Sequence, residues 1–311
     1  MDPLIYVLQT IVFIGIFGIV ALSLNLEYGF TGLGNFGKVA FFLTGAYTYA
    51  ILTEAGVHFI LCIIIAALVS GLIGSLIALP ALRLREDYLA IVTLAFGEII
   101  RTIVKAEHWI ANGVWGITVP QAINLEDASF RMTMLAQVGL VFICLALCFV
   151  FVQLLTNSPY GRIMRAIRED DIAVSTLGKS RLRYKAQVFF MGSAIAGIGG
   201  ALFAQYTGYV EPYMFMPMVT FTVWIMVLLG GPANNWGVLL GAALVTLFNR
   251  GTIIIKDYVS LPVDPNNLQY ILLGVLIILI LLYRPGGLLK ESRITTKASE
   301  KASQWKRHSS E

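Results

Sequence analysis

Long apolar stretches separated by short polar ones run through most of this chain of 311 residues. Each is close to the ~20 residues that a helix needs to cross a bilayer. The stretches are continuous rather than alternating, which argues against an outer-membrane barrel. The pattern predicts an all-α, polytopic membrane protein with about nine (eight to ten) transmembrane helices, at residues 4–25, 37–53, 59–82, 88–104, 134–156, 186–208, 213–231, 237–255 and 267–283. The second and fourth are short enough to be tilted, broken or re-entrant.

Composition agrees with this pattern. Hydrophobic residues make up 58% of the chain and charged residues 13%, which is more apolar surface than a soluble domain of this length could bury. The N-terminus lacks the basic segment of a cleaved signal peptide, so we expect the first span to remain. The three cysteines, Cys62, Cys144 and Cys148, lie in apolar stretches, where we expect small core residues rather than disulfides or metal ligands.

The distribution of basic residues predicts the orientation. With the N-terminus outside, the inner segments are 26–38, 83–87, 157–185, 232–236 and 284–311. Together they hold 17 of the 22 Lys and Arg residues, although 232–236 has none. Basic residues collect in cytoplasmic loops, so we expect an N-out, C-in topology. The net charge of +4 is therefore a sign of topology and not of nucleic-acid binding. Residues 1–290 are the expected transmembrane domain, with a cytoplasmic loop at 157–185, and residues 291–311 are a basic polar tail expected to be disordered.

Residues 157–185 form the one long charged segment between the first and last apolar stretches. Ser158 followed by Pro159 predicts a helix start, and Gly178 predicts a left-handed helix end. Between them an apolar face recurs at helical spacing, at Ile163, Ile167, Val174 and Leu177, and three arginines lie three apart, at Arg162, Arg165 and Arg168. An amphipathic helix between spans indicates a docking surface for another protein. The alternative is a loop that only satisfies topology.

Two other features carry candidate chemistry. Glu98 and Arg101 lie three residues apart inside the fourth predicted span. They form either a structural pair, with Arg101 reaching the outer surface, or a polar patch on a solute path. Residues 32–38, GLGNFGK, match the start of a phosphate-binding loop, but Val39 follows where Ser or Thr is required and no strand precedes. We interpret them as a glycine-rich entry to the second span, where backbones approach closely. No catalytic motif occurs, so we predict no enzyme.

Several segments together resemble one family. SPYGRIMRAIREDDIAVSTLGKSRLRYKAQVF, residues 158–189, closely resembles the cytoplasmic loop of permease subunits of branched-chain amino acid ABC importers. ALRLREDYLAIVTLAFGEIIR, residues 81–101, resembles the larger of the two permeases of that family. The resemblance extends over about residues 5–290 through GFTGLGNFGKVAFFLTGAYTYA (29–50), GGPANNWGVLLGA (230–242) and RPGGLL (284–289). The family often has a Ser-Leu-Gly run where this chain has Asn35 to Lys38, so Lys38 is a charge at an unusual place.

The resemblance implies a helical ABC-importer permease in which residues 158–178 form the coupling helix seated on a cytoplasmic ATPase. The implied contact residues are Gly161, Arg162, Arg165, Ala166, Ile167, Arg168, Glu169, Asp170, Ala173, Leu177 and Gly178. It implies no cofactor bound by this chain, because ATP is hydrolysed by the separate ATPase subunits. It also implies a second, related permease in a heterodimer, an extracytoplasmic solute-binding protein, and the cell membrane of a prokaryote.

The solute stays open at this point. Branched-chain or related amino acids fit the resemblance best, and related permeases serve urea and short amides. A stand-alone secondary transporter or channel is an alternative of another class. It would more often show inverted repeats and broken helices with polar sites at mid-membrane. The sequence presents only Glu98 and Arg101 as such a polar feature.

Overall fold

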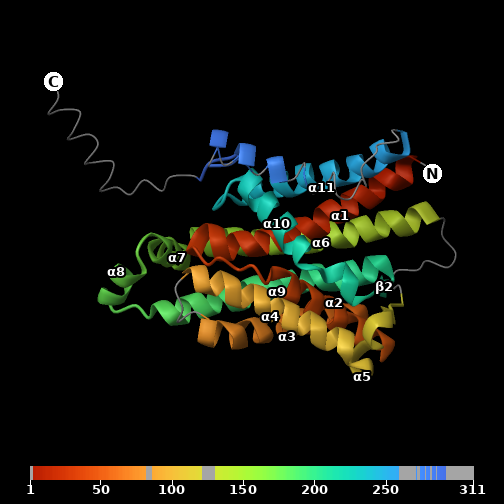
Figure 1. Cartoon of the computed structure of the whole chain (residues 1–311), viewed down its shortest axis with the longest axis horizontal. Helices are drawn as coiled ribbons and strands as arrows, with labels where there is room; N and C mark the ends of the chain where they lie inside the picture. Colours follow the sequence, from red (N-terminus) through yellow and green to blue (C-terminus); the bar gives the residue numbers. More distant parts are fainter. Residues whose placement is uncertain are drawn as a thin grey trace.

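The computed structural model of the chain describes residues 3–81, 86–120, 130–258 and, towards the C-terminus, 271, 274–276, 278–280, 282–284 and 286–291. Long helices lie side by side along one axis, and two short helices, α7 (Pro159–Glu169) and α8 (Asp171–Thr176), project from one end (Figure 1). The N-terminus lies at the other end of the bundle. The all-α class of polytopic membrane protein is confirmed.

Among the described residues, eight long helices build the bundle: α1 (Pro3–Leu24), α2 (Lys38–Glu54), α3 (Phe59–Ala81), α4 (Glu86–Ala106), α6 (Phe130–Asn157), α9 (Arg181–Thr207), α10 (Pro217–Gly230) and α11 (Asn235–Tyr258). Each corresponds to one of the first eight predicted spans. Four described helices are long and apolar enough to cross a membrane, at Leu4–Gly29, Phe59–Pro80, Arg131–Asn157 and Arg181–Thr207. In the ninth predicted span, 267–283, the described residues 271, 274–276, 278–280 and 282–283 are all helical. The others, and all of the tail 291–311 except Glu291, lie outside the described residues, so the count of nine stays a prediction.

The remaining elements are short. A π-helix, η1 (Asn25–Gly29), continues α1, and α5 (His108–Ala111), η2 (Gly113–Trp115) and η3 (Pro212–Phe215) lie near the end opposite α7. Two strands, β1 (Ile117–Thr118) and β2 (Tyr209–Val210), pair antiparallel with Ile117 opposite Val210. This pairing connects the segment that follows α4 and η2 to the residues directly after α9.

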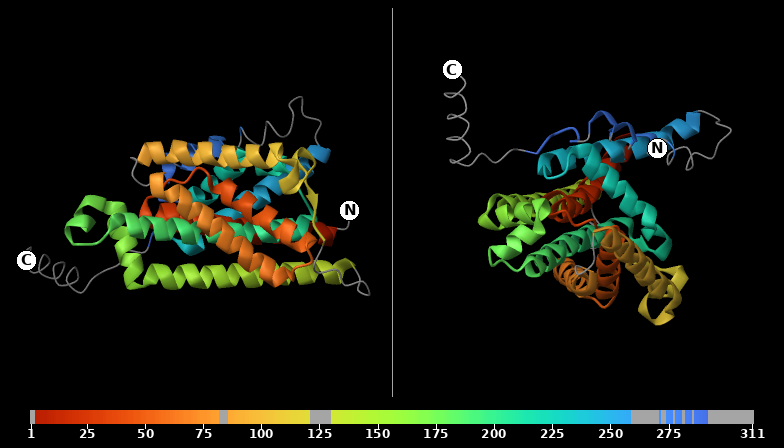
Figure 2. Two further views of the ribbon diagram at one scale, coloured as in Figure 1. Left: turned by 90° about the horizontal axis from the view of Figure 1, so that it is seen from below. Right: turned by 60° about the vertical axis from the view of Figure 1, so that its left-hand side comes forward.

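The helices form layers. α10 and α11 lie on one side, α2, α3 and α4 on the other, and α1, α6 and α9 between them, as the right-hand view of Figure 2 also shows. Glycines let α9 approach its neighbours: a Cβ atom on Gly200 would collide with the Phe42 carbonyl of α2. Cys62, Cys144 and Cys148 are free thiols, as expected.

The connection between α1 and α2 differs from the prediction. Residues 26–38 are predicted to be an inner loop, yet Leu26, Glu27, Asn35 and Lys38 are all fully buried. After η1 the chain re-enters the bundle as an irregular stretch, residues 32–37, which we call segment 32–37. α2 then begins inside the protein and, with 17 residues, is about 26 Å long, short of the ~30 Å hydrocarbon core.

Candidate functional site

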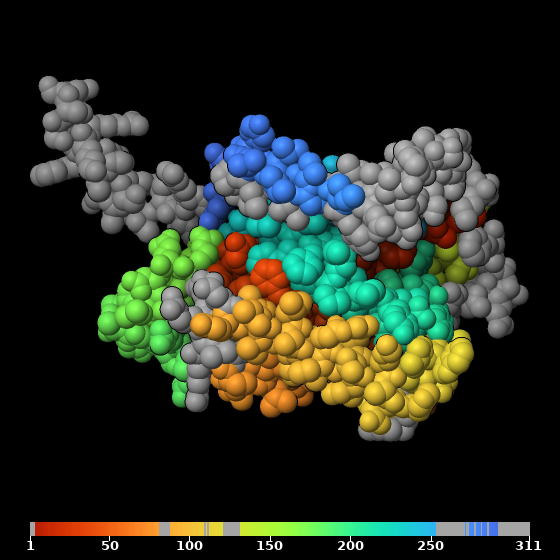
Figure 3. All heavy atoms as spheres, in the orientation of Figure 1, coloured from red at the N-terminus to blue at the C-terminus, as the bar shows by residue number. Residues whose placement is uncertain are grey.

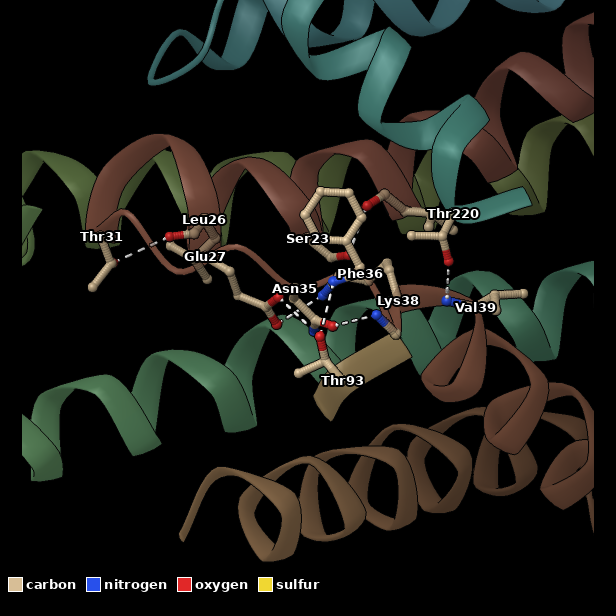
Figure 4. Close-up of polar contacts among 12 residues, drawn as sticks. Ser23, Leu26, Glu27, Thr31, Asn35, Phe36, Lys38, Val39, Thr93 and Thr220 are labelled. Atoms are coloured by element: carbon tan, nitrogen blue, oxygen red, sulfur yellow. Dashed lines mark hydrogen bonds and ion pairs between the residues drawn. The ribbon is translucent and has the colours of Figure 1, made fainter. Parts of the chain in front are cut away.

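A fully buried ion pair joins a residue before segment 32–37 to the residue directly after it. Glu27 belongs to η1, before the segment, and Lys38 is the first residue of α2, after it. The Lys38 ammonium lies 2.7 Å from Glu27 Oε1, and neither side chain has any solvent exposure. Figure 4 shows both side chains among the helices that surround the segment. A π-helix inside an α-helix is often found at a functional site, and here it carries the carboxylate.

Neighbouring polar groups complete this cluster. Asn35 donates its side-chain amide to Glu27 Oε2 at 2.9 Å and accepts the Gly37 N–H at 2.9 Å. The Trp224 indole of α10 donates to the Asn35 carbonyl at 3.2 Å. The backbone N–H of Phe36 donates to the Thr93 hydroxyl of α4 at 3.1 Å (Figure 4). Segment 32–37 is therefore held by η1, α4 and α10 together.

Sequence reasoning missed the Glu27–Lys38 pair. Lys38 stood out as a charge at an unusual place, but its partner lies 11 residues earlier, on the far side of the glycine-rich stretch. Opposite charges on both sides of a glycine-rich stretch between two apolar spans were the available signal. The close approach expected there is confirmed, because a Cβ atom on Gly37 would collide with the Thr93 carbonyl.

A second polar contact joins the end of α1 to the turn between α10 and α11. Asn25 donates to the Asn235 side chain at 2.9 Å and accepts the Ala233 N–H at 2.8 Å. Asn235 in turn donates to Gln153 of α6 at 2.7 Å. Residues 232–236, predicted as an uncharged inner segment, form a tight turn with Ala233 at φ +62°.

The charged segment begins and ends as predicted, but it is not one helix. The Ser158 hydroxyl accepts the Tyr160 N–H at 3.1 Å, and Gly178 has φ +72°. The predicted single helix over 158–178 is wrong, because Asp170 adopts an extended conformation between α7 and α8. Its carboxylate accepts the N–H groups of Ile172 and Ala173 at 2.9 and 3.0 Å and so starts a second helix.

The apolar face of this segment is also divided. Met164, Ile167 and Val174 are buried. Leu177, predicted on the same face, is 79% exposed, and Ile172 is 66% exposed. Two large apolar side chains therefore lie open on α8 and its end. Among the predicted contact residues, those that are exposed are Arg162, Glu169, Asp170, Ala173, Leu177 and Gly178.

Arg165 and Arg168 turn towards their own chain, whereas Arg162 is exposed. The Arg168 guanidinium donates to the Gly29 carbonyl and, at 2.7 Å, to Glu291. Arg165 lies 3.3 Å from the Glu291 carboxylate and its guanidinium stacks over the Phe30 ring at 5.1 Å. Burial lowers the pKa of the Arg165 guanidinium, and the Glu291 charge opposes that shift. The two arginines thus join α7 to the residues just before segment 32–37.

Two further contacts attach the loop to α6 and α9. Gly161 is buried, and a Cβ atom there would collide with the Thr156 carbonyl of α6. Asp171 of α8 pairs with Arg181 and Lys185 of α9, each at 3.0 Å. Burial alone would raise the pKa of the Asp171 carboxyl, but these two cations outweigh burial and hold the pKa below its usual range.

Glu98 and Arg101 form the predicted ion pair on α4, three residues apart. The Glu98 side chain is 42% exposed and that of Arg101 13%. Lys105, one turn further, lies 4.9 Å above the Tyr213 ring of η3. The structure does not join this pair to Glu27 and Lys38 by any hydrogen bond or ion pair among the described residues.

Comparison with known proteins gives a consistent result. Residues 6–281 match the family described as the permease component of branched-chain amino acid transport systems. The probable branched-chain amino acid transport permease protein LivM of Methanocaldococcus jannaschii is 33% identical over 92% of this chain and 94% of its own. The high-affinity branched-chain amino acid transport system permease protein LivM of Salmonella typhimurium is 36% identical over 89% of this chain and 68% of its own. The LivH permease of the same organism is 25% identical over 88% of this chain and 91% of its own. No solved structure matches.

Proposed function

This chain belongs to the family of permease components of branched-chain amino acid transport systems and resembles its larger, LivM-type subunit. From this premise we propose that it is the transmembrane subunit of an ATP-driven importer of branched-chain or related amino acids. It acts with a second permease of the LivH type, since both LivM and LivH of one organism are similar to it. Cytoplasmic ATPases hydrolyse the ATP, and an extracytoplasmic binding protein delivers the solute.

The proposed setting is the inner or plasma membrane of a prokaryote, with about nine spans within residues 1–290 and an N-out, C-in orientation. The positions of α7 and α8 support this orientation. They lie at the opposite end of the bundle from the N-terminus (Figure 1), as a cytoplasmic loop requires when the N-terminus is outside. The basic residues of 157–185 favour the same side.

The observation that carries the coupling role is the exposed apolar pair Ile172 and Leu177 on helices that project from the bundle. Exposed large apolar side chains next to charged ones are typical of protein interfaces. Arg162, Glu169 and Asp170 supply the charges around them. We assign these residues to the contact with the ATPase.

Arg165 and Arg168 have a different part in this proposal. They bind Gly29, Phe30 and Glu291 of their own chain, so they do not orient the ATPase directly. When the ATPase pair closes and moves α7, these contacts pull the start of segment 32–37. The movement thus reaches the middle of the bundle through two side chains.

Glu98 and Arg101 are proposed as polar contacts for the solute. A carboxylate that is 42% exposed on a predicted membrane helix has to face water or protein, because an ionised group facing lipid is costly. A zwitterionic amino acid offers an ammonium group to Glu98 and a carboxylate to Arg101.

The test is the double variant Ile172→Glu/Leu177→Glu, purified with its partner subunits and placed in liposomes with a binding protein. We expect loss of the co-purifying ATPase and of ATP-dependent leucine uptake, with an unchanged elution profile. Leu182→Glu, an exposed apolar residue at the start of α9, is the matched control and should retain both. If the double variant keeps the ATPase, the contact lies elsewhere, and uptake without ATP would favour a secondary transporter.

A further inference from the structure

Segment 32–37 places irregular backbone inside a membrane helix bundle. Such backbone does not face lipid, because its peptide groups have no partner there. It occurs only where protein buries it or where it lines a water-filled space. Some groups of this segment are satisfied: the Gly32 N–H by Tyr28, the Leu33 N–H by the Glu27 carbonyl and the Phe36 N–H by Thr93. Neither the N–H nor the carbonyl of Gly34 has a hydrogen-bond partner among the described residues.

The segment has an inner and an outer edge. Leu33, Asn35 and Gly37 are buried, and the alternate positions Gly32, Gly34 and Phe36 are partly exposed. The unpartnered peptide groups of Gly34 therefore lie at the edge that is not packed against the bundle.

Aromatic side chains of α10 stand beside this outer edge. The Phe36 ring stacks on Trp224, with centroids 4.5 Å apart, and lies 5.9 Å from Phe221, which is 40% exposed. On the other side, Gly97 of α4 lies against Gly37, and Glu98 follows it in the chain. Figure 3 shows atoms from the early part of the chain, red to orange, at the surface between α10 and α4.

We infer that the outer edge of segment 32–37, at Gly34 and Phe36 between α4 and α10, lines the path of the transported amino acid. The aromatic rings of Phe36 and Phe221 suit a branched apolar side chain. The open N–H and carbonyl of Gly34 suit the carboxylate and ammonium of a free amino acid. The inference rests on the proposed function, and it adds which backbone the solute meets.

The Glu27–Lys38 pair has a supporting part in this arrangement. It lies behind the segment, joins its two ends, and has no exposure with which to meet the solute. Through Arg168 and Gly29 the same segment is attached to α7. Because the ion pair connects the residues on either side of the segment, we expect the segment to move as a rigid unit. A displacement of Gly29 by α7 would then displace Gly34 and Phe36 together.

Cysteine labelling of the assembled importer tests the path. The background is Cys62→Ala/Cys144→Ala/Cys148→Ala, whose ATP-dependent leucine uptake is checked first. Gly34→Cys suits the purpose because a Cβ atom there meets only the Phe36 ring, at 3.9 Å. Phe221→Cys is a second probe on the other wall. Leu147→Cys and Leu154→Cys, exposed residues of α6 on another face of the bundle, are the controls.

We expect a water-soluble, membrane-impermeant methanethiosulfonate to label Gly34→Cys and Phe221→Cys and to leave both controls unlabelled. Saturating leucine should slow the labelling several-fold, and labelling should stop uptake. If uptake is normal in the background but neither probe is labelled, or leucine gives no protection, the path is elsewhere and the importer assignment stands. If the parent protein with its three cysteines shows no ATP-dependent uptake with all subunits present, the proposed function itself fails. If only the cysteine-free background is inactive, the probes are introduced into the parent, where the parent without probes gives the baseline labelling.

Discussion

Glu27–Lys38 and Glu98–Arg101 are two ion pairs of the same chemistry in opposite surroundings. The first joins η1 to the start of α2 across segment 32–37, and both side chains are fully buried. The second lies along one face of α4, and the Glu98 side chain is 42% exposed. Asn35 and the backbone around it complete the first pair, whereas the described contacts of the second are those between its own members.

The two pairs should differ in how much folding stability is lost when one partner is removed. Removing one partner of a buried pair leaves an uncompensated charge and costs about 3–5 kcal/mol. An exposed pair contributes only about 0–1 kcal/mol. The buried pair therefore fixes the position of segment 32–37, whereas the partly exposed Glu98 is open to the solute contact proposed above. The two pairs thus differ in burial, and we expect them to differ in role as well.

The largest expected effect comes from breaking the buried pair. Lys38→Met leaves the Glu27 carboxylate buried without its cation, so we expect unfolding in detergent to become easier by about 3–5 kcal/mol. The double variant Glu27→Gln/Lys38→Met removes both charges and should recover most of that loss. Thermal unfolding of the purified chain, followed by tryptophan fluorescence, measures both.

Arg101→Met is the matched control for this experiment. It also leaves a carboxylate without its arginine, but the Glu98 side chain is 42% exposed and is proposed to face the solute path. The loss should therefore stay under about 1 kcal/mol. Equal losses in Lys38→Met and Arg101→Met would show that burial does not separate the two pairs.

A smaller loss of stability is expected when a methyl group is added beside the buried pair and both charges are kept. A Cβ atom on Gly192 of α9 would collide with the Glu27 carboxylate, so Gly192→Ala should destabilise the protein by about 1–3 kcal/mol. Gly139→Ala on α6 has nothing within 4 Å of the new Cβ atom. It should stabilise its helix by up to about 1 kcal/mol. The two alanines should therefore shift the unfolding temperature in opposite directions.

The sequence predicts the helices better than it predicts how they are broken. Apolar length locates α1 to α4, α6 and α9 to α11, because a span needs a minimum number of apolar residues. Glu98 and Arg101 are predictable as a pair because three residues bring side chains together on one helix. Glu27 and Lys38 meet only because the chain turns back at segment 32–37, which depends on contacts with Thr93 and Trp224 far along the chain.

The charged loop gives the same lesson. Ser158 and Gly178 mark its ends through local chemistry, which a sequence reveals directly. The break at Asp170 is local as well, because its carboxylate accepts the N–H groups of Ile172 and Ala173. The inward turn of Arg165 and Arg168, in contrast, depends on Gly29, Phe30 and Glu291. No pattern within 157–185 indicates those partners.

An effect on transport without an effect on folding is expected for the exposed pair. Glu98→Gln removes a charge but keeps the shape of the side chain, so the stability change should stay under about 1 kcal/mol. Uptake of leucine should require a higher solute concentration if Glu98 contacts the ammonium group. The concentration dependence of uptake, compared with that of Glu107→Gln outside the helix, is the measurement. A stability loss with unchanged uptake would assign the pair to packing.

The smallest effect is expected at Asp171, an ion pair outside the predicted spans. Arg181 and Lys185 hold the pKa of this carboxyl below its usual range. Its pairing therefore stabilises the fold above the ordinary pKa of Asp, ~3.9, and the contribution disappears as the pH falls through the lower folded value. The Asp171 side chain is 30% exposed, so water screens the pair and the amount is about 0.2–1 kcal/mol. Unfolding temperatures of the parent and Asp171→Asn should differ at neutral pH and converge on acidification. A difference that persists in acid would mean that Asp171 acts through its hydrogen bonds and not through its charge.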